Sequence, residues 1–172
     1  FINLHPRHPH TDYAYYLRGL ASFTEDSGLL SRYINTDLSK RDVTQAQISF
    51  DDLSDFVSRF PKSEYANHAK QRMVYLRNLL AQHEINVAEY YLERKAYIGA
   101  IGRAKYIIEH LPKTPQTPQA LNILIMAYKE LGHEELANKN KEILSFNYPN
   151  YLMVENASGV SQRSLLNKLT FG

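Results

Sequence analysis

Three histidines stand close together near the start of the chain, where they could coordinate a metal ion. His5, His8 and His10 belong to the segment HPRHPH, in which Pro6 and Pro9 favour an extended backbone. Neither acidic residues nor cysteines recur beside them at ligand spacing, although protein zinc sites are built from such sets. We therefore expect a solvated loop between helices here, and no metal site.

Motifs of known enzymes are incomplete in this sequence. The pairs His83–Glu84 and His133–Glu134 lack the second histidine that the HExxH zinc-protease motif requires. The segment 37–42 resembles a calcium loop, but it has arginine at its fifth position and no glycine at its sixth. Cysteine is absent, which excludes disulfides, thiolate metal sites and cysteine nucleophiles.

Three carboxylates, Asp51, Asp52 and Asp55, follow one another closely enough to share a site. Catalytic carboxylate pairs need a pocket that moves their pKa values apart. These three residues are expected on the face of a helix opposite its apolar stripe, where they are solvated. There is also no glycine-rich phosphate loop and no GxSxG motif. We predict that the protein is not an enzyme, has no catalytic residues and needs no cofactor.

Tyrosine and arginine gather in one stretch, and these residue types contribute much of the binding energy at protein interfaces. The chain has 13 tyrosines in 172 residues. Most are expected in the core, but five tyrosines and arginines form a candidate partner-binding group: Tyr90, Arg94, Tyr97, Arg103 and Tyr106.

Two glycines, Gly99 and Gly102, fall inside the same predicted helix. Each costs about 1 kcal/mol relative to alanine in a helix, so something is expected to approach that helix closely. The adjacent helix of a hairpin is the preferred explanation for the glycines. For Arg103 a partner is preferred, because it lies off the apolar stripe formed by Tyr97, Ile101, Ala104 and Ile108.

Composition excludes several classes of protein. Apolar residues make up 44% of the chain, too many for a disordered protein. The 20 basic and 18 acidic residues give a net charge of +2, without the basic excess of a nucleic-acid binder. The apolar run at 120–128 is interrupted by Asn122 and is too short to span a membrane.

The positions of these residues follow from an internal repeat. The segments FINLHP at 1–6 and FVSRFP at 56–61 each end in proline and are followed by Tyr-Ala, at 13–14 and 65–66. Further copies end at Pro112 and Pro149. An apolar residue followed by proline ends a helix, and a nearby Ser, Thr or Asp begins the next. One such hairpin cannot bury its own apolar face, so neighbouring hairpins must stack. The repeat predicts an all-α, tetratricopeptide-type solenoid of helical hairpins.

Six helices are expected between the prolines, at about 11–25, 43–60, 64–94, 97–111, 118–131 and 134–146. The first should bury Tyr13, Tyr16, Leu17, Leu20 and Phe23. The third would span about 45 Å without a break, and Gly132 should end the fifth. The polar stretch 26–42 is expected to be an exposed loop that binds no metal. The repeats are assigned to 1–150 and a poorly ordered tail to 151–172. Since FINLHP is typical of the last turn of a helix, we expect the natural N-terminus to be missing.

Three segments are more specific than a bare repeat. They are the run 80–111, which contains AQHEINVAEYYLERKAYIGAIGR, the YLRG at 16–19 and the DLSKRD at 37–42. Together they resemble the BamD family, tetratricopeptide lipoproteins of the β-barrel assembly machinery. The resemblance extends from Phe1 to about Pro149, and the tail from Tyr151 matches nothing in the family.

The resemblance implies a non-enzymatic scaffold at the periplasmic face of the bacterial outer membrane. Membrane association would depend on an N-terminal lipid that this fragment lacks. The implied partners are a POTRA domain of BamA, other lipoproteins of the same complex and unfolded outer-membrane proteins, but no nucleic acid. In the family, an arginine of a helix pairs with an acidic residue of the POTRA domain. The resemblance places this arginine at Arg103, by its spacing from Glu93 and Arg94 at the start of the same motif.

A generic tetratricopeptide adaptor that binds a peptide in its concave groove is the alternative. The long third helix and the 37–42 loop favour the BamD family, because an ordinary adaptor needs neither.

Overall fold

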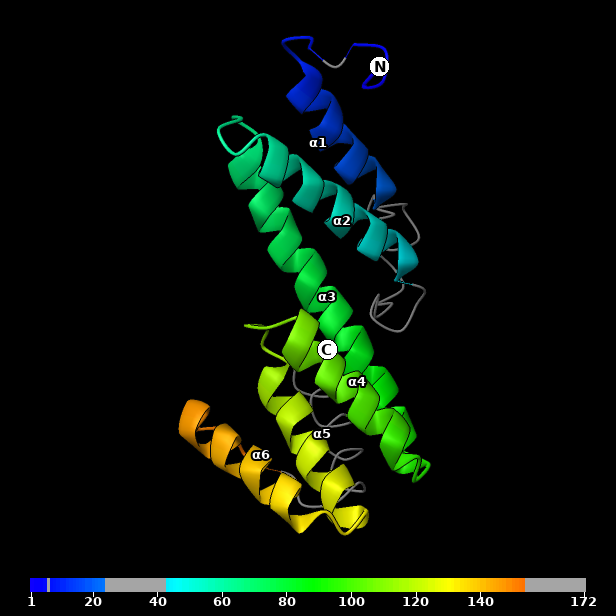
Figure 1. Cartoon of the computed structure of the whole chain (residues 1–172), viewed down its shortest axis with the longest axis vertical. Helices are drawn as coiled ribbons and strands as arrows, with labels where there is room; N and C mark the ends of the chain where they lie inside the picture. Colours follow the sequence, from blue (N-terminus) through cyan, green and yellow to red (C-terminus); the bar gives the residue numbers. More distant parts are fainter. Residues whose placement is uncertain (6, 24–42, 154–172) are drawn as a thin grey trace, which may run out of the picture. The chain divides into compact units, whose positions relative to one another are not determined.

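The computed structural model describes residues 1–5, 7–23 and 43–153, and the regular secondary structure in these ranges is helical throughout (Figure 1). Six helices follow one another: α1 (Thr11–Ser22), α2 (Thr44–Arg59), α3 (Ala66–Glu93), α4 (Tyr97–His110), α5 (Thr117–Glu130) and α6 (Glu134–Asn147). The expected all-α fold of helical hairpins is confirmed. The loop predicted at 26–42 lies outside the described residues, as does nearly all of the tail.

The contacts divide the chain into two compact units, Phe1–Leu80 and Ala81–Gly172. The division falls inside α3, which is nevertheless a single helix of 28 residues. Its continuity past His83 confirms the prediction of one long third helix. The boundary predicted at residue 150 stays a prediction, although Tyr151 packs on the core cluster formed by Leu121, Ile125 and Leu144.

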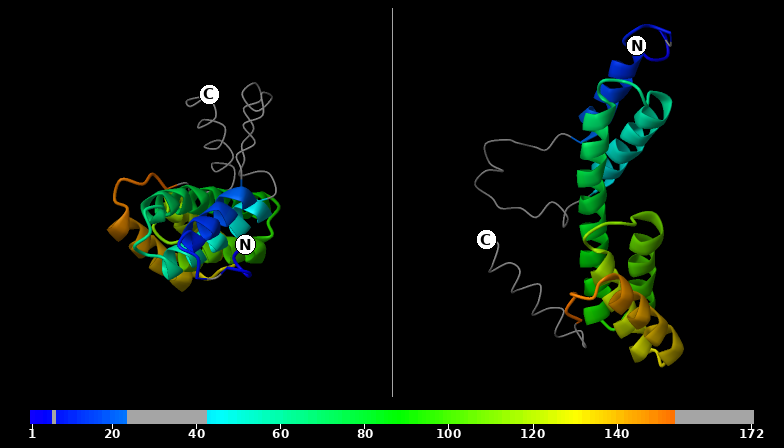
Figure 2. Two further views of the ribbon diagram at one scale, coloured as in Figure 1. Left: turned by 90° about the horizontal axis from the view of Figure 1, so that it is seen from above. Right: turned by 90° about the vertical axis from the view of Figure 1, so that its left-hand side faces the viewer.

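In the first unit, α1 and α2 approach closely at a glycine; Figure 2 shows the two helices side by side in both views. A Cβ atom placed on Gly19 would lie 2.5 Å from Cδ2, 2.7 Å from Cγ and 3.2 Å from the backbone nitrogen of Leu53. Leu53 is completely buried and cannot swing away. The buried Ser49 hydroxyl donates a 2.6 Å hydrogen bond to the Gly19 carbonyl. The contact therefore joins the backbone of α1 directly to α2.

The close contact with α2 determines which side chains of α1 are buried. Tyr16 is 8% exposed, as expected, but Tyr13 and Leu17 are 40% and 43% exposed. The prediction that these two residues are buried is wrong. The apolar spacing identified the right side of the helix, but the buried face is narrower because it centres on Tyr16 and Gly19, where α2 comes closest.

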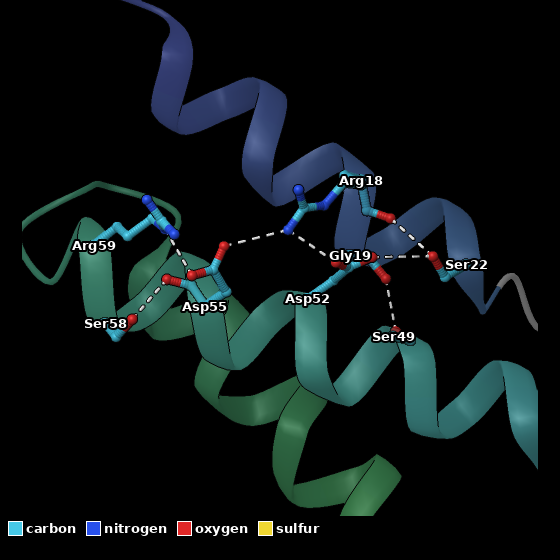
Figure 3. A network of polar contacts seen from close by, with 8 residues as sticks. All are labelled: Arg18, Gly19, Ser22, Ser49, Asp52, Asp55, Ser58 and Arg59. Atoms are coloured by element: carbon cyan, nitrogen blue, oxygen red, sulfur yellow. Dashed lines mark hydrogen bonds and ion pairs between the residues drawn. The ribbon is translucent and has the colours of Figure 1, made fainter. Parts of the chain in front are cut away.

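Two arginines and two aspartates link the exposed edges of α1 and α2 (Figure 3). Arg18 Nη2 lies 2.8 Å from Asp52 Oδ1 and 3.3 Å from Asp55 Oδ2, and Arg59 Nε lies 2.6 Å from Asp55 Oδ1. Both guanidinium groups also lie over the ring of Tyr15, at 5.0 and 5.5 Å from its centroid. The hydrogen bond from Arg59 is the main reason that the pKa of Asp55 is lowered. Of the three acids predicted to be solvated, Asp51 is exposed, whereas Asp52 and Asp55 are half-buried and pair with these arginines.

In the second unit, α5 lies between α4 and α6 and contacts both. Residues from Ala120 to Tyr128 are buried without exception, so all faces of this stretch are covered. A short apolar run without a clear stripe is what such a central helix requires. The run that is too short to span a membrane is therefore the core of this unit.

Two helices end in the same way. After α5, Gly132 has φ +73°, His133 donates to the Tyr128 carbonyl and Gly132 to that of Lys129. These bonds form a Schellman motif, which confirms the predicted stop at Gly132. After α3, Lys95 takes the equivalent place with φ 60°. A lysine can therefore hold the left-handed position for which glycine is better suited.

We expect Gly19→Ala to lower the melting temperature of the chain. Alanine gains up to about 1 kcal/mol in helix propensity, but an added methyl group against the buried Leu53 costs about 1–3 kcal/mol. The net loss should lower the transition by a few degrees, since ~1 kcal/mol corresponds to about 2–4 °C at this chain length. Thermal unfolding followed by circular dichroism measures it.

Gly102→Ala is the matched control, because a Cβ placed there meets nothing within 4 Å apart from its chain neighbours and the nearby backbone of its own helix. This variant makes the same glycine-to-alanine change in a helix without a clash, so the melting temperature should stay the same or rise. A Gly19→Ala variant as stable as the parent would show that α1 and α2 can separate at no cost.

We expect Asp55→Asn to destabilise the chain at neutral pH and much less in acid. The folded pKa of Asp55 is lowered, so the carboxylate stabilises the fold above the ordinary aspartate pKa of about 4. This contribution is lost as the pH falls through the folded pKa. Urea unfolding at about pH 7 and pH 2.5 should show that the difference in the free energy of unfolding between variant and parent is smaller in acid. Asp51→Asn is the control, since Asp51 accepts its hydrogen bond from Gln47 instead of an arginine. A difference that persists in acid would exclude the charge as its cause.

Candidate functional site

The five predicted partner-binding residues all belong to the second unit, on the hairpin formed by α3 and α4. Tyr90 lies in the last turn of α3 and Arg94 directly follows that helix, whereas Tyr97, Arg103 and Tyr106 belong to α4. Their contacts lead to four different places. The group is therefore a set of separate features on one hairpin.

Arg103 reaches across the hairpin to an acid of α3. Its Nη1 atom lies 3.3 Å from Glu84 Oε2. The Arg103 side chain is 46% exposed and that of Glu84 is 14% exposed. An arginine has five N–H donors in a planar fork, so one contact leaves most of them available. Glu84 restrains the guanidinium without covering it.

The two glycines of α4 have different surroundings. A Cβ atom on Gly99 would lie 3.1 Å from two ring atoms of Tyr91, so this glycine allows α3 to pack closely. The adjacent helix accounts for Gly99, as expected. Gly102 has no such neighbour and is exposed. The adjacent helix therefore does not account for Gly102.

Gly102 lies between two exposed apolar side chains. Ile98 and Tyr106 are four residues before and after it, and they are 72% and 38% exposed. Residues four apart share a face of a helix. The three positions form the open strip of α4: an isoleucine, a gap without a side chain, and a tyrosine whose ring contacts His110.

Tyr97 is half-buried and its side chain is held by a neighbouring helix. Its hydroxyl donates a 3.0 Å hydrogen bond to Glu130 Oε2 of α5. Desolvation and this hydrogen bond raise the pKa of Tyr97. The phenol therefore remains protonated and links α4 to α5. Tyr97 therefore has a role in the fold, and its contact with a partner stays a prediction.

Tyr90 and Arg94 form an exposed pair. The Arg94 guanidinium lies 4.4 Å from the centre of the Tyr90 ring, and Tyr90 is 51% exposed. A stacked arginine and tyrosine present apolar area and charge together. Both members of this pair are exposed and thus accessible to a partner.

Sequence reasoning missed Glu84 and Ile98. The pairing of Glu84 with Arg103 depends on the register of two antiparallel helices, which the sequence does not indicate. Ile98 could have been found, because it lies off the buried stripe at i−4 from an unexplained glycine.

The structure offers no obvious metal centre in the part of the chain that it describes. No group of three or more histidine, cysteine or acidic side chains is placed to hold an ion within residues 1–5, 7–23 and 43–153. His8 Nδ1 instead accepts a hydrogen bond from the His10 backbone, and the rings of His5 and His8 contact Phe1. Across the same ranges, no helix is long and apolar enough to cross a membrane.

Helical hairpins with proline-marked ends define a tetratricopeptide-type protein. Comparison with known proteins gives the particular family. The family model described as YfiO, outer membrane lipoprotein, matches residues 1–144. The chain therefore belongs to the YfiO family.

Curated relatives carry the name outer membrane protein assembly factor BamD. The chain is 39% identical to that of Xylella fastidiosa strain Temecula1 over 151 residues, which cover 88% of this chain and 52% of the relative. It is 42% identical to the Neisseria gonorrhoeae protein over 149 residues, with 87% and 56% covered. For Vibrio cholerae the identity is 32% over 147 residues, with 86% and 61% covered. The chain thus spans little more than half the length of these relatives.

Proposed function

We propose that this chain is the tetratricopeptide part of an outer-membrane protein assembly factor and that it acts as a non-enzymatic scaffold. The match to the YfiO family over residues 1–144 supports this, as do the relatives named assembly factors. The family description, outer membrane lipoprotein, supports a location at the outer membrane. We place the protein on its periplasmic face, held there by a lipid, as the family description suggests.

The α3–α4 hairpin is proposed to dock on a POTRA domain of BamA. The observation that carries this proposal is the exposure of Arg103 beside the open strip of Ile98, Gly102 and Tyr106. Protein interfaces typically combine arginine with aromatic and apolar anchors. The gap at Gly102 would let the partner approach the helix backbone, and Tyr90 with Arg94 would extend the contact.

Arg103 would bind an acid of the partner. The guanidinium fork suits a carboxylate in two-point contact, and Glu84 occupies only Nη1 in the described structure. Because Glu84 is mostly buried and stays with α3, the arginine is already oriented before the partner arrives. Such preorganisation reduces the entropy lost on binding.

Further partners are proposed from the same family relation. They are the other lipoproteins of the assembly complex and the unfolded outer-membrane proteins that it handles. Nucleic acid is not proposed, since the net charge is only +2.

The experiment compares Arg103→Ala with Glu84→Ala in binding to the soluble POTRA domains of BamA. Removing one side of a partly desolvated interface pair costs about 2–5 kcal/mol. Arg103→Ala should therefore weaken binding at least tenfold, because about 1.4 kcal/mol is a factor of ten. Glu84→Ala retains the arginine and should bind within a few-fold of the parent. Isothermal titration calorimetry measures both.

Stability and charge controls accompany these variants. Both should leave helicity and melting temperature nearly unchanged, since a single ion pair with a half-exposed arginine is worth only about 1 kcal/mol or less. Arg103→Glu should weaken binding further, and reversing the POTRA acid to arginine should partly restore it. Equal losses for Arg103→Ala and Glu84→Ala would mean that Arg103 acts only within the hairpin. Parent-like binding by Arg103→Ala would exclude this site.

A further inference from the structure

An open hollow of about 600 Å³ lies in the first unit. It is lined by residues 7–9 and 11–12, around the start of α1, and by residues 59–63, at the end of α2 and in the loop after it. Both segments lie at the proline-marked helix boundaries of the repeat. In each, a basic residue directly follows a proline: Arg7 and Lys62. Stacking the repeats therefore brings two equivalent cations to one hollow.

These cations are not neutralised by the structure that surrounds them. Arg7 and Lys62 are exposed, and the described residues place no carboxylate within ion-pair distance of either. Arg59, the third cation of the lining, is paired with Asp55. Asp12 is the one acid in the lining. The hollow thus carries an excess of positive charge.

Asp12 is already engaged. One of its oxygens accepts a 2.7 Å hydrogen bond from the Ser63 hydroxyl, and the other accepts the Tyr13 backbone N–H at 2.8 Å. The first bond ties the two lining segments together. The second, with the bond from Thr11 N–H to the His8 carbonyl, leaves the start of α1 with fewer free amides to hold an anion. An incoming anion would be held by the side chains of Arg7 and Lys62.

The hollow also has an apolar wall. Pro9, Phe60 and Pro61 contribute to it. The Phe60 ring is fixed against Tyr15 and Phe56, with centroids 5.3 and 6.0 Å away. A ligand that fits must therefore present negative charge beside apolar surface.

We infer that this hollow binds an acidic segment of an extended polypeptide, with carboxylates on Arg7 and Lys62 and an apolar side chain against Phe60. The chemistry favours a polypeptide over a free phosphate, because phosphate sites at helix ends rely on free backbone N–H groups, which Asp12 partly occupies. The hollow is open at the surface, whereas small-molecule sites enclose most of their ligand. The inference is independent of the docking proposed for α4.

The test is an NMR titration of the ¹⁵N-labelled 172-residue chain with the acetylated, amidated peptide Glu-Gly-Phe-Gly-Glu. Its glutamates and phenylalanine share one face when the peptide is extended, because alternate residues of an extended chain point the same way. We expect amide shifts confined to residues 7–12 and 59–63, and binding that weakens with added salt, since exposed charges are screened. The double variant Arg7→Glu/Lys62→Glu should weaken binding at least about tenfold. Lys70→Glu/Lys141→Glu makes the same change in net charge on exposed helix surfaces and should leave the affinity within a few-fold of the parent.

Other probes separate the alternatives. The matching glutamine–phenylalanine peptide should not bind, and inorganic phosphate and phosphatidylglycerol vesicles should not shift the same amides. Circular dichroism checks folding, and Arg7→Gln/Lys62→Gln provides a second variant if the charge reversal unfolds the chain. If both charge-reversal double variants lost the same affinity for the peptide, only the net charge of the chain would matter, and the inference would be wrong. Shifts elsewhere in the chain, or phosphate or vesicles binding in place of the peptide, would overturn the inference.

Discussion

Each helix of this protein must cover its apolar residues with its neighbours, and the rest of the structure depends on how closely those neighbours can approach. In the first unit the approach is set by a backbone contact, because Gly19 has no side chain to separate α1 from Leu53 of α2. In the second unit, α5 is buried on all sides between α4 and α6. Small residues and central apolar runs therefore determine the packing, while charged residues such as Arg18 and Asp52 fix the edges.

The helices could be predicted well from the sequence, and their contacts could not. Prolines and glycines mark where the helices end, so most predicted ends, such as those of α4, fall within a residue or two of those in the structure. Apolar spacing overestimated the buried face of α1, because Tyr13 and Leu17 are exposed. The pairing of Glu84 with Arg103 needs the register of a hairpin, which depends on packing such as that of Tyr91 against Gly99.

For the candidate site, too, the residue types could be read from the sequence but their contacts could not. Residue type alone grouped Tyr97 with Tyr90, but the structure gives Tyr97 a partner in α5 and leaves Tyr90 exposed beside Arg94. Similarly, Gly99 and Gly102 are equivalent in the sequence and differ in what lies next to them. Whether a polar or small residue serves the fold or a partner is decided by neighbours that are distant in sequence.

The short sequence separation between contacting helices also affects how the chain folds. Within the units, α1 packs on α2, α4 on α5 and α5 on α6, so the main helix contacts join segments adjacent in sequence. Proteins dominated by local contacts have low contact order and fold in about microseconds to milliseconds. Short loop closures suffice to form each hairpin. Either unit can therefore gain structure early, so that its apolar helix faces remain uncovered only briefly during folding.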